Sequence, residues 1–151
     1  MFKPTTTLTP TPQQHRNNSV VFDHIFVGTP PPLSVQELII QAKFEWEKYI
    51  LPFETTAIIP AGTYCSGNRV VLQRTETIGI LLVFSYSEIA GTGILAQASI
   101  CAALGNIPRL GYIELDITSI SSLTPYPQMI MEIIMHEIGH ALGLQHSFTA
   151  G

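Results

Sequence analysis

Three of the five histidines of this chain lie in one short run, His-Glu-Ile-Gly-His-Ala-Leu-Gly-Leu-Gln-His at positions 136–146. His136 and His140 are four residues apart, so a helix would place both imidazoles on one face, where they can reach a single cation. Glu137 follows the first of them, and its carboxylate could hold and deprotonate a water at the metal. The spacing therefore predicts a helix that carries a metal site together with its catalytic base.

The second half of the run supplies a turn and a third nitrogen ligand. Gly143 can adopt a positive φ, which would end the helix and turn the chain sharply. His146 would then reach the same cation. Three protein ligands leave one tetrahedral position open, which is typical of a catalytic rather than a structural zinc site. We therefore predict one catalytic Zn²⁺ held by His136, His140 and His146.

The same run resembles the signature of the metzincin zinc endopeptidases. Residues 136–147 look most like the matrixins, whereas residues 19–117 resemble bacterial leishmanolysin-like domains. The upstream cues are Ala42, Trp46 and Ile50 in a long helix, the segment 93–98, and the segment 108–116. The short spacing from Gly143 to His146 departs from leishmanolysin itself, which has a long insertion there. We therefore assign the clan by resemblance and leave the family open.

The resemblance implies an α/β (α+β) fold, the upper subdomain of a metzincin. Such a subdomain has a twisted mixed sheet, mostly parallel, with a backing helix and an active-site helix. One antiparallel edge strand lines the cleft, and residues 94–98 match it best in order and motif. Ile94, Leu95 and Ala96 are therefore expected to pair with an extended peptide, the alternative being an ordinary edge strand with small side chains. Gln97 stands where matrixins have a histidine for a structural zinc, so no second zinc is predicted.

The motif and the resemblance together predict zinc-dependent hydrolysis of peptide bonds, with Glu137 as the general base. A rival interpretation is a non-catalytic zinc-binding or interaction domain derived from a metzincin. A further alternative takes a distant glutamate as the third ligand, which would make His146 dispensable. Asp116 is the one carboxylate that we considered as a calcium ligand. We do not predict calcium, because an aspartate at a strand end more typically caps a turn.

The resemblance implies a protein or peptide substrate as the partner, and the composition argues against nucleic acid and a membrane span. The net charge of −4 offers no basic patch, so nucleic acid is not expected. The longest apolar runs, 78–84 and 129–135, are too short to span a bilayer. The resemblance implies a secreted, extracellular protein, although no signal peptide is visible.

The pattern along the chain predicts alternating strands and helices. Ser34 and Glu37 suggest a capping box at the start of a helix that reaches Ile50, with Trp46 and Tyr49 on its buried face. The remaining predicted elements are strands at 20–27, 55–59, 70–73, 78–84 (buried on both faces), 94–100 and 112–117 (one wetter face), and a helix from Gln128 to about Leu142.

The first seventeen residues are rich in Thr, Pro and Gln and predict a disordered tail or linker before a catalytic domain over 18–151. Metzincins carry a methionine turn after the third histidine, and none occurs up to Gly151, so we expect a fragment of a longer protease or else a truncated relative. Cys65 and Cys101 are assigned to loops, and the sequence leaves their pairing open. His15 and His24 are expected to be surface or sheet residues rather than ligands.

Overall fold

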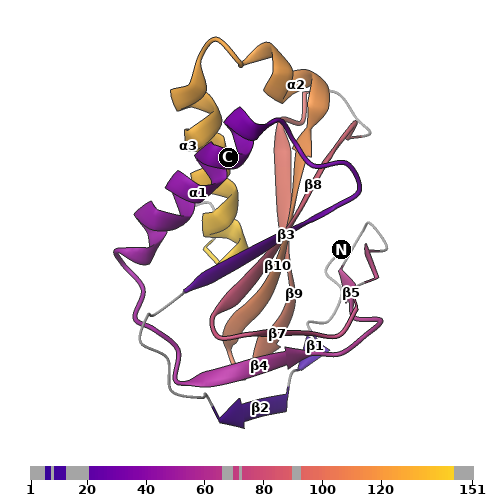
Figure 1. Ribbon diagram of the computed structural model, residues 1–151, viewed down its shortest axis with the longest axis vertical. Helices are drawn as coiled ribbons and strands as arrows, with labels where there is room; N and C mark the ends of the chain where they lie inside the picture. The colour runs from indigo at the N-terminus through magenta and orange to yellow at the C-terminus, as the bar shows by residue number, and fades with distance from the viewer. Residues whose placement is uncertain are drawn as a thin grey trace.

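The computed structural model describes residues 6–7, 9–12, 21–65, 70–71, 73–89 and 93–144 (Figure 1). His15, His146 and the residues after it therefore lie outside the described part of the chain. The described elements, in chain order, are β1 (Thr6–Thr7), β2 (Thr9–Pro12), β3 (Phe22–Val27), α1 (Leu33–Glu47), β4 (Thr55–Ile59), β5 (Tyr64–Cys65), β6 (Val70–Val71), β7 (Thr75–Thr77), β8 (Ile80–Ser87), β9 (Ala96–Leu104), β10 (Ile107–Asp116), α2 (Ile117–Ser122) and α3 (Pro127–Ala141).

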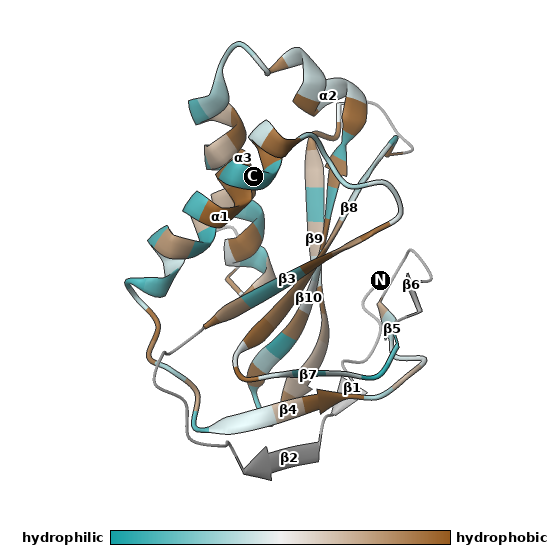
Figure 2. Ribbon diagram, viewed as in Figure 1, coloured by the Kyte–Doolittle hydropathy of each residue, from teal (hydrophilic) through white to brown (hydrophobic). Residues whose placement is uncertain are grey.

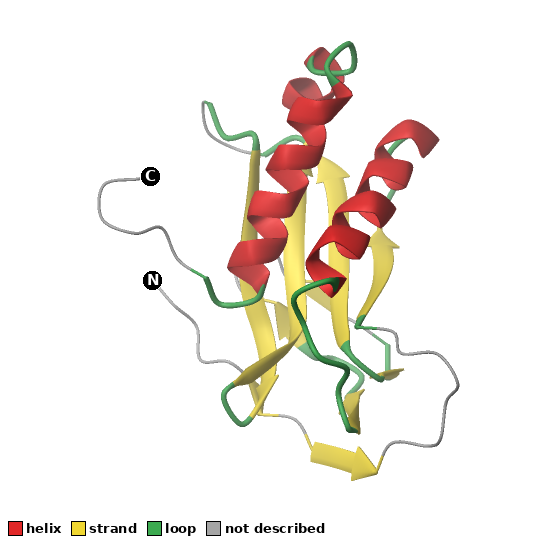
Figure 3. Cartoon of the chain, turned by 90° about the vertical axis from the view of Figure 1, so that its left-hand side faces the viewer, coloured by secondary structure: helices red, strands yellow, loops and turns green. Residues whose placement is uncertain are grey.

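The main sheet has five strands in the order β1-β9-β10-β8-β3. Strands β3, β8 and β10 are parallel to one another, and β9 runs antiparallel to β10. Helices α1 and α3 lie side by side across one face of this twisted sheet (Figure 3). The predicted mixed α/β fold, with a backing helix and a helix that carries the histidine motif, is confirmed.

The main core lies between the two helices and the sheet. On α1, Val35, Ile39 and Ala42 are buried, as expected for apolar residues three and four positions apart on one helical face. They pack against the residues of the sheet that point toward the helices, Ile80, Leu82, Phe84, Ile113 and Leu115. Figure 2 shows apolar colouring along much of the central strands, and apolar residues alternating with polar ones along the two helices.

The opposite face of the sheet is covered by a second, smaller core. Leu81 and Val83 point to this side and pack with Ala57 and Ile59 of β4, which belongs to a three-stranded sheet with β2 and β7. Because alternate residues of β8 enter two different cores, Ile80–Phe84 is buried throughout. The prediction of a strand buried on both faces is therefore confirmed.

Cys65 and Cys101 form a disulfide within this second core. Their Cα atoms lie 4.8 Å apart, and the bond joins β5 to β9. Both residues belong to strands, so their assignment to loops is wrong. The question of pairing, which the sequence left open, is answered by the spatial arrangement of two strands 36 positions apart along the chain.

Gly111 on β10 allows α3 to approach the sheet closely. A Cβ atom added at this position would lie 2.8 Å from the Cβ of Ala141 and 3.4 Å from a methyl group of Leu82. Carbon atoms in favourable contact are about 3.5–4.0 Å apart, so any side chain here would displace the helix. The absence of a side chain therefore sets how deeply the end of α3 is seated.

The capping box predicted at Ser34 is wrong. Pro32, in extended conformation with ψ of 154°, is the N-cap of α1, and its carbonyl accepts hydrogen bonds from the amides of Val35 and Gln36. Ser34 therefore lies inside the helix and forms no cap. The helix also ends at Glu47, so Tyr49 falls beyond it and is 78% exposed instead of buried.

The predicted strand at 112–117 is longer and differently buried. It spans Ile107–Asp116, and Tyr112, Glu114 and Asp116 are all buried, so the expected wetter face is wrong. The phenol of Tyr112 donates to Ser85 Oγ at 2.9 Å, and Gln97 Nε2 donates to Glu114 Oε1 at 2.8 Å. Polar residues are accommodated on this face because neighbouring strands supply hydrogen-bond partners.

Asp116 ends the strand and begins α2, a helix that the sequence analysis missed. Its carboxylate accepts hydrogen bonds from the backbone amides of Ile89 and Ser119, at 2.8 and 2.9 Å, and from Ser119 Oγ at 2.8 Å. The predicted capping role of Asp116 is confirmed. These bonds stabilise the charged form and lower the pKa of Asp116.

Two parts of the segment that we expected to be a tail or linker are paired in strands. Thr6 and Thr7 pair with Ala102 and Ala103 of β9, and β2 pairs antiparallel with β4. Threonine suits an extended, paired backbone, and the edges of β9 and β4 offer free hydrogen-bonding groups to it. These residues are therefore part of the sheets.

Candidate metal centre

His136, Glu137 and His140 of the motif lie on the last helix, as predicted. Pro127 occupies the first turn of α3, where its missing N–H costs nothing, and the helix ends within one residue of the predicted position. Ile130, Ile134, Ile138 and Ala141 repeat at helical spacing and are buried against the sheet and α1. The apolar stripe fixes the rotation of the helix and so determines where the motif residues point.

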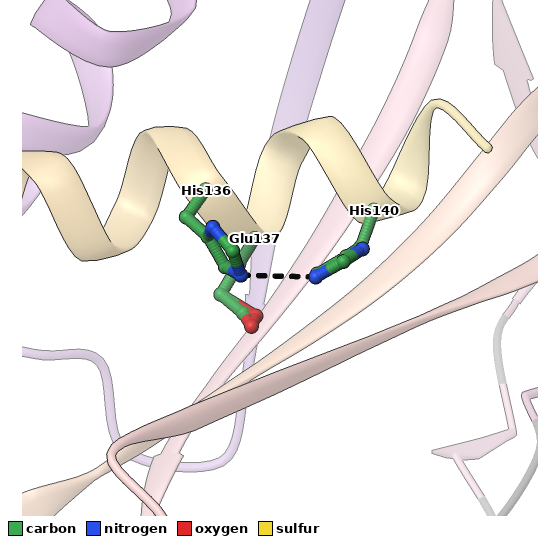
Figure 4. A group of neighbouring side chains, drawn as sticks. All are labelled: His136, Glu137 and His140. Atoms are coloured by element: carbon green, nitrogen blue, oxygen red, sulfur yellow. Dashed lines mark hydrogen bonds between the residues drawn. The ribbon is translucent and has the colours of Figure 1, made fainter. Parts of the chain in front are cut away.

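His136, Glu137 and His140 come together on one side of α3 (Figure 4). The Nε2 atoms of the two imidazoles are 3.0 Å apart, and their rings are nearly perpendicular, with centroids 4.5 Å apart. One ligand atom from each of the three side chains lies within 4.8 Å of the others. His136 is exposed and His140 partly so, whereas Glu137 is only 6% exposed.

The turn after α3 orients the second histidine. Gly143 has a φ of 93°, and its amide donates to the carbonyl of His140 at 2.9 Å, while the amide of Leu144 donates to the carbonyl of Gly139 at 3.0 Å. This pair of bonds is the Schellman arrangement, which needs a left-handed residue at the position of Gly143. The turn brings the carbonyl of Leu144 within 2.7 Å of His140 Nδ1.

The Leu144 carbonyl determines which nitrogen of His140 carries the proton. A carbonyl oxygen only accepts, so His140 Nδ1 must donate, and Nε2 keeps its lone pair for a cation. Backbone carbonyls commonly orient metal-binding histidines in this way. The sequence indicated the glycine turn, but we did not predict this partner. It could have been found from its position, because Leu144 directly follows the glycine that ends the helix.

The geometry of the two histidines fits a single zinc ion. With Zn–N bonds of about 2.0–2.1 Å and tetrahedral angles, two nitrogen ligands lie about 3.3 Å apart. The observed separation of 3.0 Å between the Nε2 atoms is close to this value, so little rearrangement of the side chains is needed. The donor set of two imidazoles and one nearby carboxylate is also one that zinc accepts.

The residues predicted to bind a peptide lie at the start of β9. Ile94 and Leu95 precede the strand, Leu95 is 44% exposed, and its carbonyl accepts the amide of Asp116 at 3.0 Å. Ala96 begins the strand and pairs with Leu115 in antiparallel register. Among the described strands, β1 pairs with the outer edge of β9 only at Ala102 and Ala103, and no described strand pairs with that edge along 96–101.

His24 lies apart from the motif, in β3. Lys43 Nζ is 2.8 Å from His24 Nδ1, and the imidazole meets the edges of Phe26 and Phe84. Burial and the charge of Lys43 lower the pKa of His24, against an opposing effect of Asp23. His24 is therefore a sheet residue that contacts α1, as expected.

Comparison with known proteins agrees with this site. Residues 124–151 match a family model described as Met-zincin, and the match spans α3 and the motif. No curated protein matches the chain. The match and the His-Glu-His group together indicate a zinc-binding, metalloprotease-like domain, compatible with one zinc ion.

Proposed function

We propose that this chain carries the catalytic centre of a zinc-dependent endopeptidase of the metzincin clan, with a zinc motif of matrixin type. The observation that carries the proposal is the pair of Nε2 atoms 3.0 Å apart with the buried Glu137 beside them. His136, His140 and His146 would hold the ion, and the turn at Gly143 would direct the chain toward the third ligand.

The protein residues would divide the reaction between them. Zinc, when bound, lowers the pKa of water toward neutrality and polarises the scissile carbonyl. Glu137 would take the proton of the attacking water on its carboxylate and deliver it to the leaving amine. The hydrogen bond from His140 Nδ1 to the Leu144 carbonyl would orient the ring so that Nε2 of the neutral imidazole faces the ion. Burial of Glu137 limits competition from bulk water for its carboxylate.

The substrate would be an extended protein or peptide chain. We place its backbone along Ile94, Leu95 and Ala96 on the edge of β9 that faces away from β10, because β10 already occupies the other edge and the carbonyl of Leu95. The position beside α3 supports this, because α3 and β9 are packed against each other. Exposure of Leu95 supports a contact with the substrate.

We further propose that the protein acts outside the cytosol. The disulfide between Cys65 and Cys101 supports this, because such bonds persist in oxidising compartments. Among the helices that the structure describes, none combines the length and the apolar character needed to cross a bilayer.

Replacing the general base tests the proposed mechanism. Glu137→Gln in the full-length protein should keep the fold and the zinc content but slow cleavage of casein or unfolded protein by about two to four orders of magnitude. Glu132→Gln is a matched control, because Glu132 is an exposed carboxylate on the same helix, and this variant should cleave at the wild-type rate.

The two alternatives predict different results. Equal cleavage by the Glu137→Gln form and the wild type would contradict the mechanism. Zinc binding by the full-length wild type without cleavage of any member of a broad peptide library would instead support a non-catalytic zinc-binding domain.

A further inference from the structure

Trp46, the only tryptophan of the chain, contacts α3 at two residues beside the metal centre, Met135 and Gly139. It lies in the last turn of α1, and its indole Nε1–H donates to the carbonyl of Met135 at 3.0 Å. Met135 immediately precedes His136. A carbonyl oxygen has two lone pairs, so Met135 can accept this bond and still take part in the helical hydrogen bonding of α3.

The ring of Trp46 also fills the space beside Gly139, the residue that precedes His140. A Cβ atom added at Gly139 would lie 3.2 Å from Cζ2 and 3.7 Å from Cη2 of the indole. The six-membered ring therefore rests against bare backbone of the helix. One side chain thus contacts the residue before each of the two histidines.

This contact lies close to the C-terminal end of α3. The helix ends at Ala141, and terminal turns lose hydrogen bonds most readily. The Schellman turn holds the end through the carbonyl of Gly139, and Trp46 holds the turn before it through the carbonyl of Met135. Together they leave the turn that separates the two imidazoles little freedom to unwind.

We propose that Trp46 is a positioning residue of the metal centre. By fixing the turn from Met135 to Gly139, it maintains the 3.0 Å separation of the His136 and His140 Nε2 atoms that suits a shared zinc ion. The proposal rests on the zinc site proposed above. A Trp46 that served only as core packing would affect stability and leave zinc affinity unchanged.

Trp46→Phe separates these two roles. Phenylalanine keeps an aromatic ring but removes the Nε1–H and the atoms that reach Gly139. Zinc affinity is measured by competition with a chromophoric chelator, at a temperature where circular dichroism shows each form to be fully folded. We expect affinity to fall by about 10–100-fold, the range typical of lost outer-shell partners. The visible spectrum of the Co²⁺-loaded form should change as well, because it reports ligand geometry.

Ile39→Val provides the matched control. Ile39 is fully buried in the same helix and the same core, but it precedes Trp46 by seven residues. It takes part neither in the hydrogen bond of the indole to Met135 nor in the contact of the indole with Gly139. This variant should lower the unfolding temperature and leave the Zn²⁺ affinity and the Co²⁺ spectrum as in the wild type.

Gly139→Ala tests the same contact from the other helix. The added methyl group would press on the indole, so Zn²⁺ affinity should fall in the wild-type background. In a Trp46→Phe background the obstructing atoms are absent, and the same change should cost less affinity. Non-additivity of this sign is expected only if the ring and the glycine act as one unit.

The outcomes distinguish the two proposals. Wild-type Zn²⁺ affinity and an unchanged Co²⁺ spectrum in Trp46→Phe would overturn the positioning role and leave the metal centre standing. Additive effects of Trp46→Phe and Gly139→Ala would also overturn it. Failure of the wild-type protein to bind Zn²⁺ would overturn both proposals.

Discussion

The close approach of α3 to the sheet at Gly111 predicts a specific loss of stability in Gly111→Ala. The new methyl carbon would lie 2.8 Å from the Cβ of Ala141, about 0.7 Å closer than a favourable carbon contact. Neither carbon terminates a flexible side chain, so the backbone of α3 or β10 must move. The φ of Gly111 is not positive, so alanine is otherwise compatible with the local backbone.

The expected cost follows from two opposing effects. Overpacking of a dense core typically costs about 1–3 kcal/mol. Alanine in place of glycine also restricts the unfolded chain, which stabilises the folded state by about 0.4–1 kcal/mol. The net free energy of unfolding should therefore fall by about 1–2 kcal/mol. For a domain of this size, that corresponds to a decrease in the unfolding temperature of about 2–8 °C.

A double-mutant cycle with Ala141→Gly isolates the contact. Removing the Ala141 methyl group leaves the new Cβ at position 111 with an ordinary contact of 3.7 Å to the Cα of residue 141. Ala141→Gly alone should cost up to about 1 kcal/mol because glycine disfavours helix. Chemical denaturation of the four forms should show the double variant to be more stable than the sum of the single effects implies, by about 1–3 kcal/mol.

Two results would refute this reasoning. Gly111→Ala could prove as stable as the wild type or more so, which is what the unfolded-chain effect alone predicts. The two substitutions could also be additive within about 0.5 kcal/mol, as independent sites are. Either result would mean that the end of α3 is not seated on the bare backbone of β10.

Three further predictions follow from the site and the two cores. His146→Ala should weaken Zn²⁺ binding by more than the roughly 10–100-fold cost of a lost outer-shell partner, and unchanged affinity by metal titration would favour a distant glutamate ligand. Because burial and Lys43 lower the pKa of His24, its contribution to stability is present above the unfolded value of about 6.5 and is lost as the pH falls below it. His24→Asn, which keeps an acceptor for Lys43, should therefore flatten the decline in unfolding temperature between about pH 7 and pH 5. Replacing Cys65 and Cys101 together by alanine should lower the free energy of unfolding by about 4 kcal/mol, from the loop of 36 residues that the disulfide closes, and a reducing agent should no longer affect the unfolding temperature.

Local patterns in the sequence determined the elements that carry the site. The four-residue spacing of His136 and His140 and the apolar stripe behind them are properties of one helix, so α3 and the meeting of the two imidazoles were predictable. The continuous apolar run of β8 likewise predicted a strand buried on both faces. Gly143 indicated the turn because few other residues adopt positive φ readily.

The tertiary structure alone decided which distant residues meet. The bond from Trp46 to the Met135 carbonyl joins positions 89 apart, and no local pattern distinguishes this tryptophan from ordinary core. Arg109, a charged residue that composition would place at the surface, is 1% exposed. Its burial is possible because the carbonyls of Gly79 and Thr55 accept hydrogen bonds from its guanidinium group, at 2.7 and 2.8 Å. The guanidinium carbon also lies 4.3 Å from the centroid of the Phe53 ring.

The difference between local patterns and long-range contacts also explains why the predictions for β10 and the two cysteines were wrong. Alternation of polar and apolar residues shows that a strand has two different faces, but not what covers each of them. Tyr112 and Glu114 are buried because Ser85 and Gln97, on neighbouring strands, bind them. Periodicity and spacing act within a segment, whereas burial and pairing depend on which segments the whole fold brings together. The sequence of this chain therefore determined the candidate ligands on α3, and the fold determined what surrounds and holds them.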